Sequence, residues 1–130
     1  MQLGGITAMI RILVVDDHDA TRSSLSSFLA HEDKFTICGE AADGVQAIEQ
    51  ARNLSPDAIV MDVSMPKMDG LSAARIIRRE SPTTQIVIIS LQEPSILRAV
   101  ASRIGLAFID KTKITNDLIP ALHHLTKFSA

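Results

Sequence analysis

Aromatic residues, cysteine and excess basic charge are all scarce in this chain of 130 residues. It contains neither tryptophan nor tyrosine, and its one cysteine, Cys38, lies within an apolar run. One cysteine excludes a disulfide framework within the chain, and with four scattered histidines it forms no zinc-ligand pattern. The net charge is -2, which argues against direct nucleic-acid binding by this chain, because domains that bind nucleic acid usually carry a basic excess.

Long apolar segments are missing as well. No uninterrupted apolar run approaches the ~18–20 residues that a membrane-spanning helix needs. The first residues lack the charged, apolar and cleavage-site regions of a signal peptide in that order. We therefore expect a cytoplasmic protein that does not contact a membrane. Residues 1–9 are expected to form a disordered leader, residues 10–127 one domain, and residues 128–130 a tail or the start of a linker.

A regular alternation of apolar runs and helical patterns fills the rest of the chain. Runs rich in valine and isoleucine predict strands at residues 10–15, 35–39, 58–62, 85–90 and 106–109. Apolar residues at three- to four-residue spacing predict helices at about residues 20–31, 45–54, 71–81, 96–104 and 116–125. Pro120 is tolerated only in a first turn, so we expect the last helix to begin close to Asn116.

Strands alternating with helices predict an α/β fold with one parallel sheet and right-handed crossovers. The strands are almost continuously apolar, which indicates that helices cover both faces of the sheet. The simplest arrangement is a flavodoxin-like (βα)5 fold, a doubly wound five-stranded sheet in the order 2-1-3-4-5. That order follows precedent among such folds, and it makes the first and third strands neighbours.

Several polar side chains fall at the C-terminal ends of these predicted strands: Asp16, Asp17, Asp62, Ser90 and Lys111. Open α/β sheets bind their ligands at this edge. Three carboxylates gathered there would repel one another, and a hard divalent cation such as Mg²⁺ would relieve the repulsion. A carboxylate nucleophile, a metal ion, a hydroxyl group and an ammonium group suffice for phosphoryl transfer to an aspartate.

Each of these residues is ordinary when taken alone. A serine at a strand end is more often a turn residue, and a lone lysine is usually a solvated charge. By itself, Asp62 is equally consistent with a residue that caps a loop. Their joint occurrence at strand ends is what indicates a functional site.

With these residues, the chain resembles the receiver domain of bacterial two-component response regulators from about residue 10 to residue 127. The matching positions are Asp16-Asp17, Asp62 within the segment MDVSMP, Met68-Asp69-Gly70, Ser90 and Lys111. The resemblance implies that Asp62 accepts a phosphoryl group from the phosphohistidine of a sensor histidine kinase or phosphotransfer protein. The chain would then act only on itself, in its own phosphorylation and dephosphorylation, and would not be an enzyme in the ordinary sense.

The resemblance also implies a set of Mg²⁺ ligands. Asp17 and Asp62 would bind the ion directly, together with the backbone carbonyl of Ser64. Asp16 would contribute through a water molecule.

The same resemblance implies a phosphorylation-dependent switch. Lys111 would pair with one phosphoryl oxygen and Ser90 would donate a hydrogen bond to another. As Ser90 moves, Phe108, at the family's aromatic switch position, would rotate into the vacated space; plain core packing is the other interpretation of Phe108. The fourth helix, fifth strand and last helix would form the output face, through which the chain could form a homodimer.

Some positions depart from the family pattern. The segment from Ser90 to Lys111 is about one residue shorter than usual, so the fourth helix or its flanking loop is expected to differ. Leu91 is bulkier than the small residue common at that position and could restrict access to the phosphoryl group. Asp110 and Thr112 replace the commoner apolar residue and proline. These changes affect signal output more than phosphorylation.

Three other functions are consistent with parts of the sequence. Residues 17–21 have the D-x-D-x-T form of haloacid-dehalogenase-type phosphatases, which would make Asp17 a Mg²⁺-dependent nucleophile, although such enzymes generally need a larger domain with a cap. A receiver-like interaction module that is never phosphorylated is a second alternative. A flavodoxin is disfavoured, because no phosphate-binding loop follows the first strand.

The patterns of the first two helices also resemble receivers that precede a helix-turn-helix domain, so a C-terminal DNA-binding domain outside this chain is a further expectation.

Overall fold

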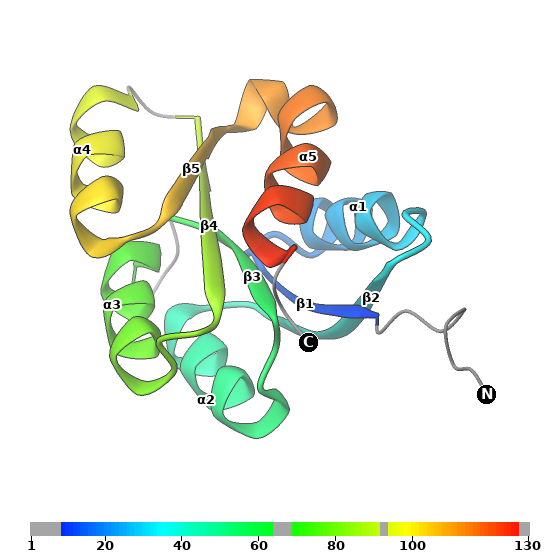
Figure 1. Cartoon of the computed structure of the whole chain (residues 1–130), viewed down its shortest axis with the longest axis horizontal. Coiled ribbons are helices and arrows are strands. Elements are labelled where there is room, and N and C mark those ends of the chain that lie inside the picture. The colour runs from blue at the N-terminus through cyan, green and yellow to red at the C-terminus, as the bar shows by residue number, and fades with distance from the viewer. Residues whose placement is uncertain (1–8, 64–68, 92–93, 128–130) are drawn as a thin grey trace.

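One parallel β-sheet with helices on both of its faces forms the protein (Figure 1). The computed structural model describes residues 9–63, 69–91 and 94–127. The strands are β1 (Ile10–Val15), β2 (Phe35–Ala41), β3 (Ala58–Asp62), β4 (Gln85–Ser90) and β5 (Ala107–Asp110). They lie in the order β2-β1-β3-β4-β5 and every neighbouring pair is parallel, which confirms the predicted flavodoxin-like topology.

Helices follow the strands in turn. They are α1 (Asp19–Ala30), α2 (Gly44–Leu54), α3 (Gly70–Glu80), α4 (Pro94–Ile104) and α5 (Ile114–Thr126), with a short 3-10 turn, η2 (Lys111–Lys113), before α5. Helices α1 and α5 cover one face of the sheet, and α2, α3 and α4 cover the other (Figure 1). Within the described residues, no helix has the length and apolar character needed to cross a membrane.

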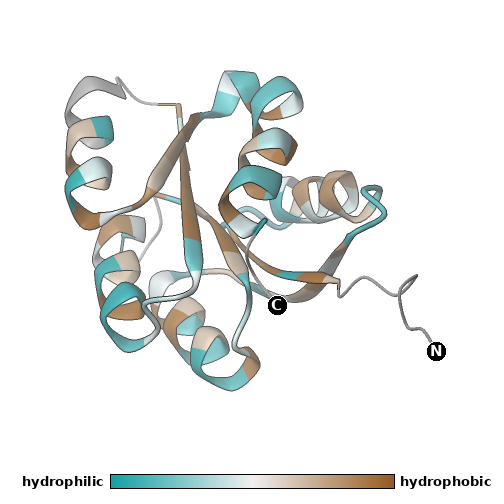
Figure 2. Cartoon of the chain, viewed as in Figure 1, coloured by the Kyte–Doolittle hydropathy of each residue, from teal (hydrophilic) through white to brown (hydrophobic). Residues whose placement is uncertain are grey.

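The two faces of the sheet support two separate apolar clusters. Along β1, Ile12 and Val14 belong to the cluster under α1 and α5, whereas Leu13 and Val15 belong to the cluster under α2, α3 and α4. This division follows from the strand geometry, in which successive side chains point to opposite faces. Figure 2 shows the resulting apolar strands at the centre of the molecule, and they explain why the sequence reads as unbroken apolar runs.

Side-chain caps set the starts of two helices. Asp43 accepts a hydrogen bond from the backbone N–H of Gln46 (2.8 Å), and the Gln46 side chain accepts one from the N–H of Ala42 (2.9 Å). Asp69 accepts a hydrogen bond from the N–H of Ser72 at 2.8 Å. Both aspartates satisfy N–H groups that a helix start leaves without partners.

The predicted start of the last helix was wrong. Helix α5 begins at Ile114, so Pro120 lies in its second turn and cannot donate the usual hydrogen bond to the carbonyl of Asn116. Leu118 and Leu122 flank Pro120 and are both fully buried against the sheet. Their burial offsets the roughly 3 kcal/mol that an internal proline costs, and Pro120 itself lies on the exposed side, where water can hydrate the freed carbonyl.

Two strands extend past their predicted ends. Strand β2 continues to Ala41 because the pairing with β1 continues as far as Val15 opposite Ala41. Strand β5 covers Ala107–Asp110, with Asp110 opposite Ser90 of β4. Polar residues at these strand ends interrupt the apolar pattern on which the predictions were based.

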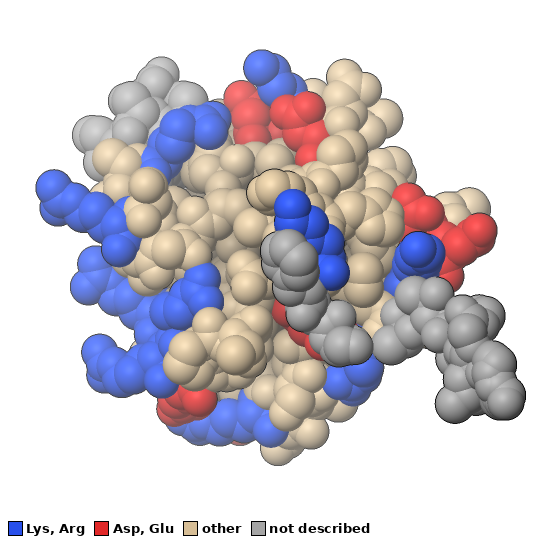
Figure 3. Space-filling view, in the orientation of Figure 1, with Lys and Arg blue, Asp and Glu red and all other residues tan. Residues whose placement is uncertain are grey.

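Charge is distributed unevenly over the surface (Figure 3). Exposed arginines gather on α2, α3 and α4: Arg52, Arg75, Arg79, Arg98 and Arg103. One of them, Arg52, is bound to Glu80 (2.6 Å). A net charge of only -2 therefore conceals a basic side of the molecule.

The burial of α5 predicts the effect of shortening Leu118. Leu118→Ala should lower the free energy of unfolding by about 2–5 kcal/mol, because it removes apolar contacts at a fully buried position and leaves a cavity. Val45→Ala, in α2, is the matched control, because Val45 is 45% exposed and should change stability by less than about 0.5 kcal/mol. Urea unfolding of both variants measures the difference. Equal losses would contradict this account of the core.

Candidate functional site

The predicted polar residues meet at the carboxyl edge of the sheet. Strands β1 and β3 are neighbours with Val15 opposite Met61, so the next residues, Asp16 and Asp62, lie side by side. On the other side of β3, Ser90 ends β4 and is paired with Asp110 of β5, directly before Lys111. Residues far apart in the sequence therefore converge because each lies at, or directly after, the C-terminal end of a strand of the same parallel sheet.

A buried ion pair lies at the centre of this edge. Lys111 Nζ donates a hydrogen bond to Asp62 Oδ2 at 2.9 Å and lies 3.8 Å from Asp16 Oδ2. Asp16 is fully buried and Asp62 is 4% exposed. Burying a carboxylate is costly unless it is paired, and one ammonium group here serves two of them.

The acidic pair retains unsatisfied oxygen atoms. Asp16 Oδ1 accepts a hydrogen bond from the N–H of His18 (2.9 Å), whereas Asp16 Oδ2 and Asp17 Oδ1 are buried and accept none. Lys111 forms ion pairs with Asp62 and Asp16, and among the described residues none is found between a lysine and Asp17. Buried carboxylate oxygens without donors fit a hard divalent cation such as Mg²⁺, which prefers oxygen ligands.

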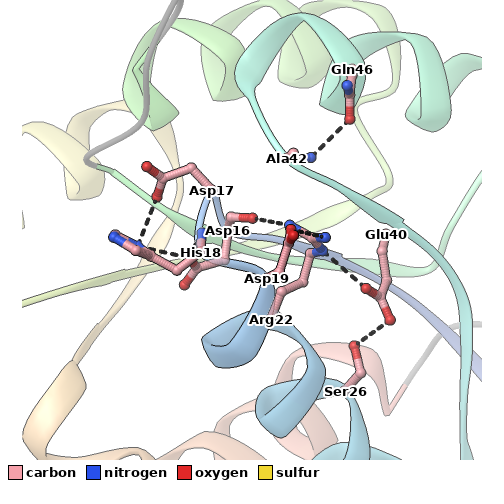
Figure 4. Close-up of polar contacts among 9 residues, drawn as sticks. All are labelled: Asp16, Asp17, His18, Asp19, Arg22, Ser26, Glu40, Ala42 and Gln46. Carbon is pink, nitrogen blue, oxygen red and sulfur yellow. Dashed lines mark hydrogen bonds and ion pairs between the residues drawn. The ribbon is translucent and has the colours of Figure 1, made fainter.

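One residue near the acidic pair was not predicted from the sequence. His18 Nδ1 lies 3.2 Å from Asp17 Oδ1 and 3.6 Å from Asp16 Oδ1, within ion-pair distance but without a hydrogen bond to either (Figure 4). The three side chains can bring one ligand atom each to within 4.8 Å of one another. A histidine that directly follows two aspartates belongs to no spaced zinc-ligand pattern, so no sequence motif indicated His18.

Arg22 anchors the end of β1 (Figure 4). Its Nη1 donates to the carbonyl of Asp16 (2.7 Å), and its other nitrogens donate to Asp19 (2.7 Å) and Glu40 (3.0 Å). Ser26 donates a further hydrogen bond to Glu40 at 3.0 Å. These acceptors, Asp19 first, raise the pKa of Arg22 above its ordinary value. The network ties the acidic pair to α1 and β2, and no sequence motif indicated it.

The end of β3 is held closely against the start of α3. The N–H of Gly70 donates to the carbonyl of Val63 (3.1 Å). A Cβ atom at Gly70 would overlap the carbonyl oxygen of Asp62 and lie 2.8 Å from Cα of Val63. Only glycine permits this approach, which explains the Asp69-Gly70 motif. The expected ligand Ser64, like Met65 to Met68, lies outside the described residues.

The turn that carries Lys111 is fixed by its neighbours. Asp110 accepts hydrogen bonds from the hydroxyl (2.7 Å) and the N–H (2.8 Å) of Thr112. These bonds, the hydroxyl one first, lower the pKa of Asp110. Asp110 and Thr112 depart from the family pattern, but together they cap the 3-10 turn that begins at Lys111. Leu91 is 70% exposed beside Ser90, which is 2% exposed.

Phe108 contacts both the core and a cation. Its ring is partly buried against the cluster beneath α2, α3 and α4. The guanidinium carbon of Arg98, on α4, lies 4.8 Å from the ring centroid, at a distance typical of a cation–π contact. The aromatic residue of β5 is therefore linked directly to α4.

Residues 12–123 match the family model described as the response regulator receiver domain. The chain belongs to this family. A receiver domain is the phosphoacceptor of two-component signalling, and this function applies to the chain.

The receiver domain is similar to proteins of several architectures. It is 41% identical over 85 residues to the response regulator GacA of Pseudomonas viridiflava, covering 65% of this chain and 40% of that protein. It is 41% identical over 83 residues to a protein-glutamate methylesterase/protein-glutamine glutaminase of Lawsonia intracellularis, covering 64% and 23% respectively. A crystal structure of a LuxR-family two-component response regulator from Aurantimonas sp. SI85-9A1 superposes with a TM-score of 0.86 at 27% identity, covering 91% of this chain and 85% of that one.

The receiver domain spans less than half the length of these two curated relatives. The methylesterase activity of the Lawsonia intracellularis protein is therefore that protein's own. Family membership removes the phosphatase and flavodoxin alternatives. In agreement, Asp19 of the D-x-D-x-T segment has a side chain that is 90% exposed and bound to Arg22.

The close contact at Gly70 predicts the effect of one added methyl group. Gly70→Ala should destabilise the protein by roughly 1–3 kcal/mol and weaken Mg²⁺ binding, because backbone atoms at the end of β3 must move to admit it. Arg75→Ala, an exposed change on the same helix, is the control and should leave both unchanged. Urea unfolding and isothermal titration with Mg²⁺ are the measurements. A Gly70→Ala protein that behaves like the control would disprove the tight fit.

Proposed function

We propose that Asp62 is the phosphoacceptor and that its donor is the phosphohistidine of a sensor histidine kinase or phosphotransfer protein. The observation that carries this assignment is the 2.9 Å contact of Lys111 Nζ with Asp62 Oδ2, inside a group of buried carboxylates. Asp62 ends the strand at the middle of the acidic edge, and it shares Lys111 with Asp16. An interaction module without phosphorylation gives no reason for so costly a group of buried charges.

The reaction follows from these positions. A carboxylate oxygen of Asp62 attacks phosphorus, the phosphorus–nitrogen bond to the donor histidine breaks, and the imidazole leaves with the electron pair. Lys111 loses its carboxylate partner as Asp62 becomes an acyl phosphate, so its ammonium group is available for a phosphoryl oxygen. The buried hydroxyl of Ser90, at the next strand end, donates a hydrogen bond to another. Water acting on the same phosphorus reverses the modification, and the chain carries out no other reaction.

The acidic residues would hold Mg²⁺. Asp17 and Asp62 are the proposed direct ligands, together with the backbone carbonyl of Ser64, and Asp16 acts through water. The unsatisfied oxygens of Asp16 and Asp17 support this assignment. Bound there, the ion neutralises charge on the phosphoryl oxygens.

Partners are proposed from the same arrangement. An apolar groove lies between the first turns of α1 and α5, lined by Thr21, Ser24, Leu25, Phe28, Ile114 and Thr115. We propose this groove as the kinase-contacting surface and α4, β5 and α5 as the output and homodimer face.

The LuxR-family relative favours a C-terminal DNA-binding domain in the longer protein. Such a regulator works in the cytoplasm, where its kinase is phosphorylated.

Intact mass spectrometry tests the phosphoacceptor. With Mg²⁺ and a small acyl phosphate, the protein should gain the mass of one phosphoryl group, and chelation of Mg²⁺ should abolish the gain. Asp62→Asn should not be labelled, because the amide cannot form the acyl phosphate. Asp117→Asn, which changes an exposed carboxylate on α5, should be labelled normally. Label on Asp17, or none on the wild type, would refute the proposal.

The contact between Arg98 and Phe108 allows a test of the proposed switch. Phe108→Ala should still be phosphorylated, but the chemical-shift changes that phosphorylation causes in α4, β5 and α5 should shrink at least severalfold, because no ring remains to couple the site to α4. Arg98→Gln should keep these phosphorylation-induced changes, although the chemical shifts of the unphosphorylated variant should differ from those of the wild type. If Phe108→Ala loses only stability and keeps the full response, Phe108 is a packing residue.

A further inference from the structure

His18 places an imidazole beside the acidic edge without taking part in the proposed phosphoryl transfer. Its Nδ1 lies 3.2 Å from Asp17 Oδ1 and 3.6 Å from Asp16 Oδ1, and the ring is turned toward both carboxylates (Figure 4). The side chain of His18 is 72% exposed, so little packing constrains its ring. Its backbone is fixed as the residue that precedes α1, with its carbonyl accepting a hydrogen bond from Arg22, and its ring approaches the carboxylates of the acidic pair.

A second observation shows that these carboxylates are poised for a cation. Asp16 is fully buried, and its Oδ2 accepts no hydrogen bond, with the ammonium of Lys111 at 3.8 Å. Asp17 Oδ1 is likewise buried and accepts no hydrogen bond. A buried carboxylate oxygen without a donor is costly, and a bound cation is the ordinary way to satisfy it.

The spacing of the donor atoms suits direct coordination of one ion by Asp17 and His18. Around an octahedral ion with metal–ligand distances of about 2.1 Å, adjacent ligand atoms lie about 3.0 Å apart. The 3.2 Å between Asp17 Oδ1 and His18 Nδ1 is close to that value. Asp16 brings a further oxygen within the 4.8 Å that encloses the group.

We propose that Asp17 and His18, with Asp16, bind a nitrogen-accepting divalent transition-metal ion that competes with Mg²⁺ for the acidic edge. Mg²⁺ takes oxygen ligands and gains nothing from the imidazole, whereas ions such as Ni²⁺ and Zn²⁺ bind imidazole readily. His18 is thus the residue that determines metal selectivity. The inference rests on the proposed Mg²⁺ site only in that the two ions share Asp17 and Asp16.

Isothermal titration of untagged protein with Ni²⁺ tests this selectivity. The wild type should bind one Ni²⁺ that excess Mg²⁺ displaces. His18→Ala should weaken that binding roughly tenfold or more while changing Mg²⁺ affinity less than twofold. Asp17→Asn should weaken the binding of both Ni²⁺ and Mg²⁺. Ni²⁺ should also broaden the imidazole NMR signals of His18 before those of His124.

Two variants control for Ni²⁺ bound elsewhere. His124→Ala removes another exposed histidine, and His123→Ala removes the imidazole 3.3 Å from Glu32, which is the other described site where a histidine meets a carboxylate outside the acidic edge. Neither variant should change the affinity for the Ni²⁺ ion that Mg²⁺ displaces. Equal urea midpoints for wild type and His18→Ala show that the fold is intact.

The outcomes separate this inference from the phosphoacceptor assignment. If His18→Ala binds Ni²⁺ as tightly as the wild type, or if Mg²⁺ does not displace Ni²⁺, the inference is wrong, whatever the mass spectrum shows. If Asp62 fails to gain a phosphoryl group but His18-dependent, Mg²⁺-displaceable Ni²⁺ binding persists, the metal selectivity stands and the proposed function falls.

Discussion

The repulsion among carboxylates at one end of the sheet is the constraint on which the rest of this structure depends. Asp16 and Asp62 are almost completely buried, and among the described residues the ammonium group within reach of both is that of Lys111. Hydrogen bonds and one lysine leave oxygen atoms of Asp16 and Asp17 unsatisfied. An edge with this excess of negative charge favours a bound cation, because the apolar packing beneath it supplies no positive charge.

The surrounding elements keep these carboxylates in place. Arg22 binds the carbonyl of Asp16 and connects it to β2 through Glu40. Gly70 lets α3 begin against the end of β3. Asp110 caps the turn that starts at Lys111. None of these groups reacts in the proposed mechanism, yet each fixes a strand end, and small displacements of strand ends would separate groups that must act together.

Much of the fold was predictable because its signal is local. Unbroken apolar runs located all five strands, and β1, β3 and β4 were predicted with their observed ends. The site residues were recognised because each lies at, or directly after, the C-terminal end of a strand, and the parallel sheet then brings Asp16, Asp62 and Lys111 together. Predictions failed where tertiary contacts outweigh local preference. Pro120 sits inside α5 because Leu118 and Leu122 are buried on either side of it.

The sequence by itself determined the alternation of elements, the covered sheet and the set of polar residues at strand ends, because periodicity and residue type are written in neighbouring positions. Only the tertiary structure decided which groups meet: Lys111 with Asp62, Arg22 with Glu40, Arg98 with Phe108, and His18 with the acidic pair. Such pairings depend on strand order, helix placement and side-chain direction. These are consequences of packing the whole chain, and no local stretch of sequence contains them.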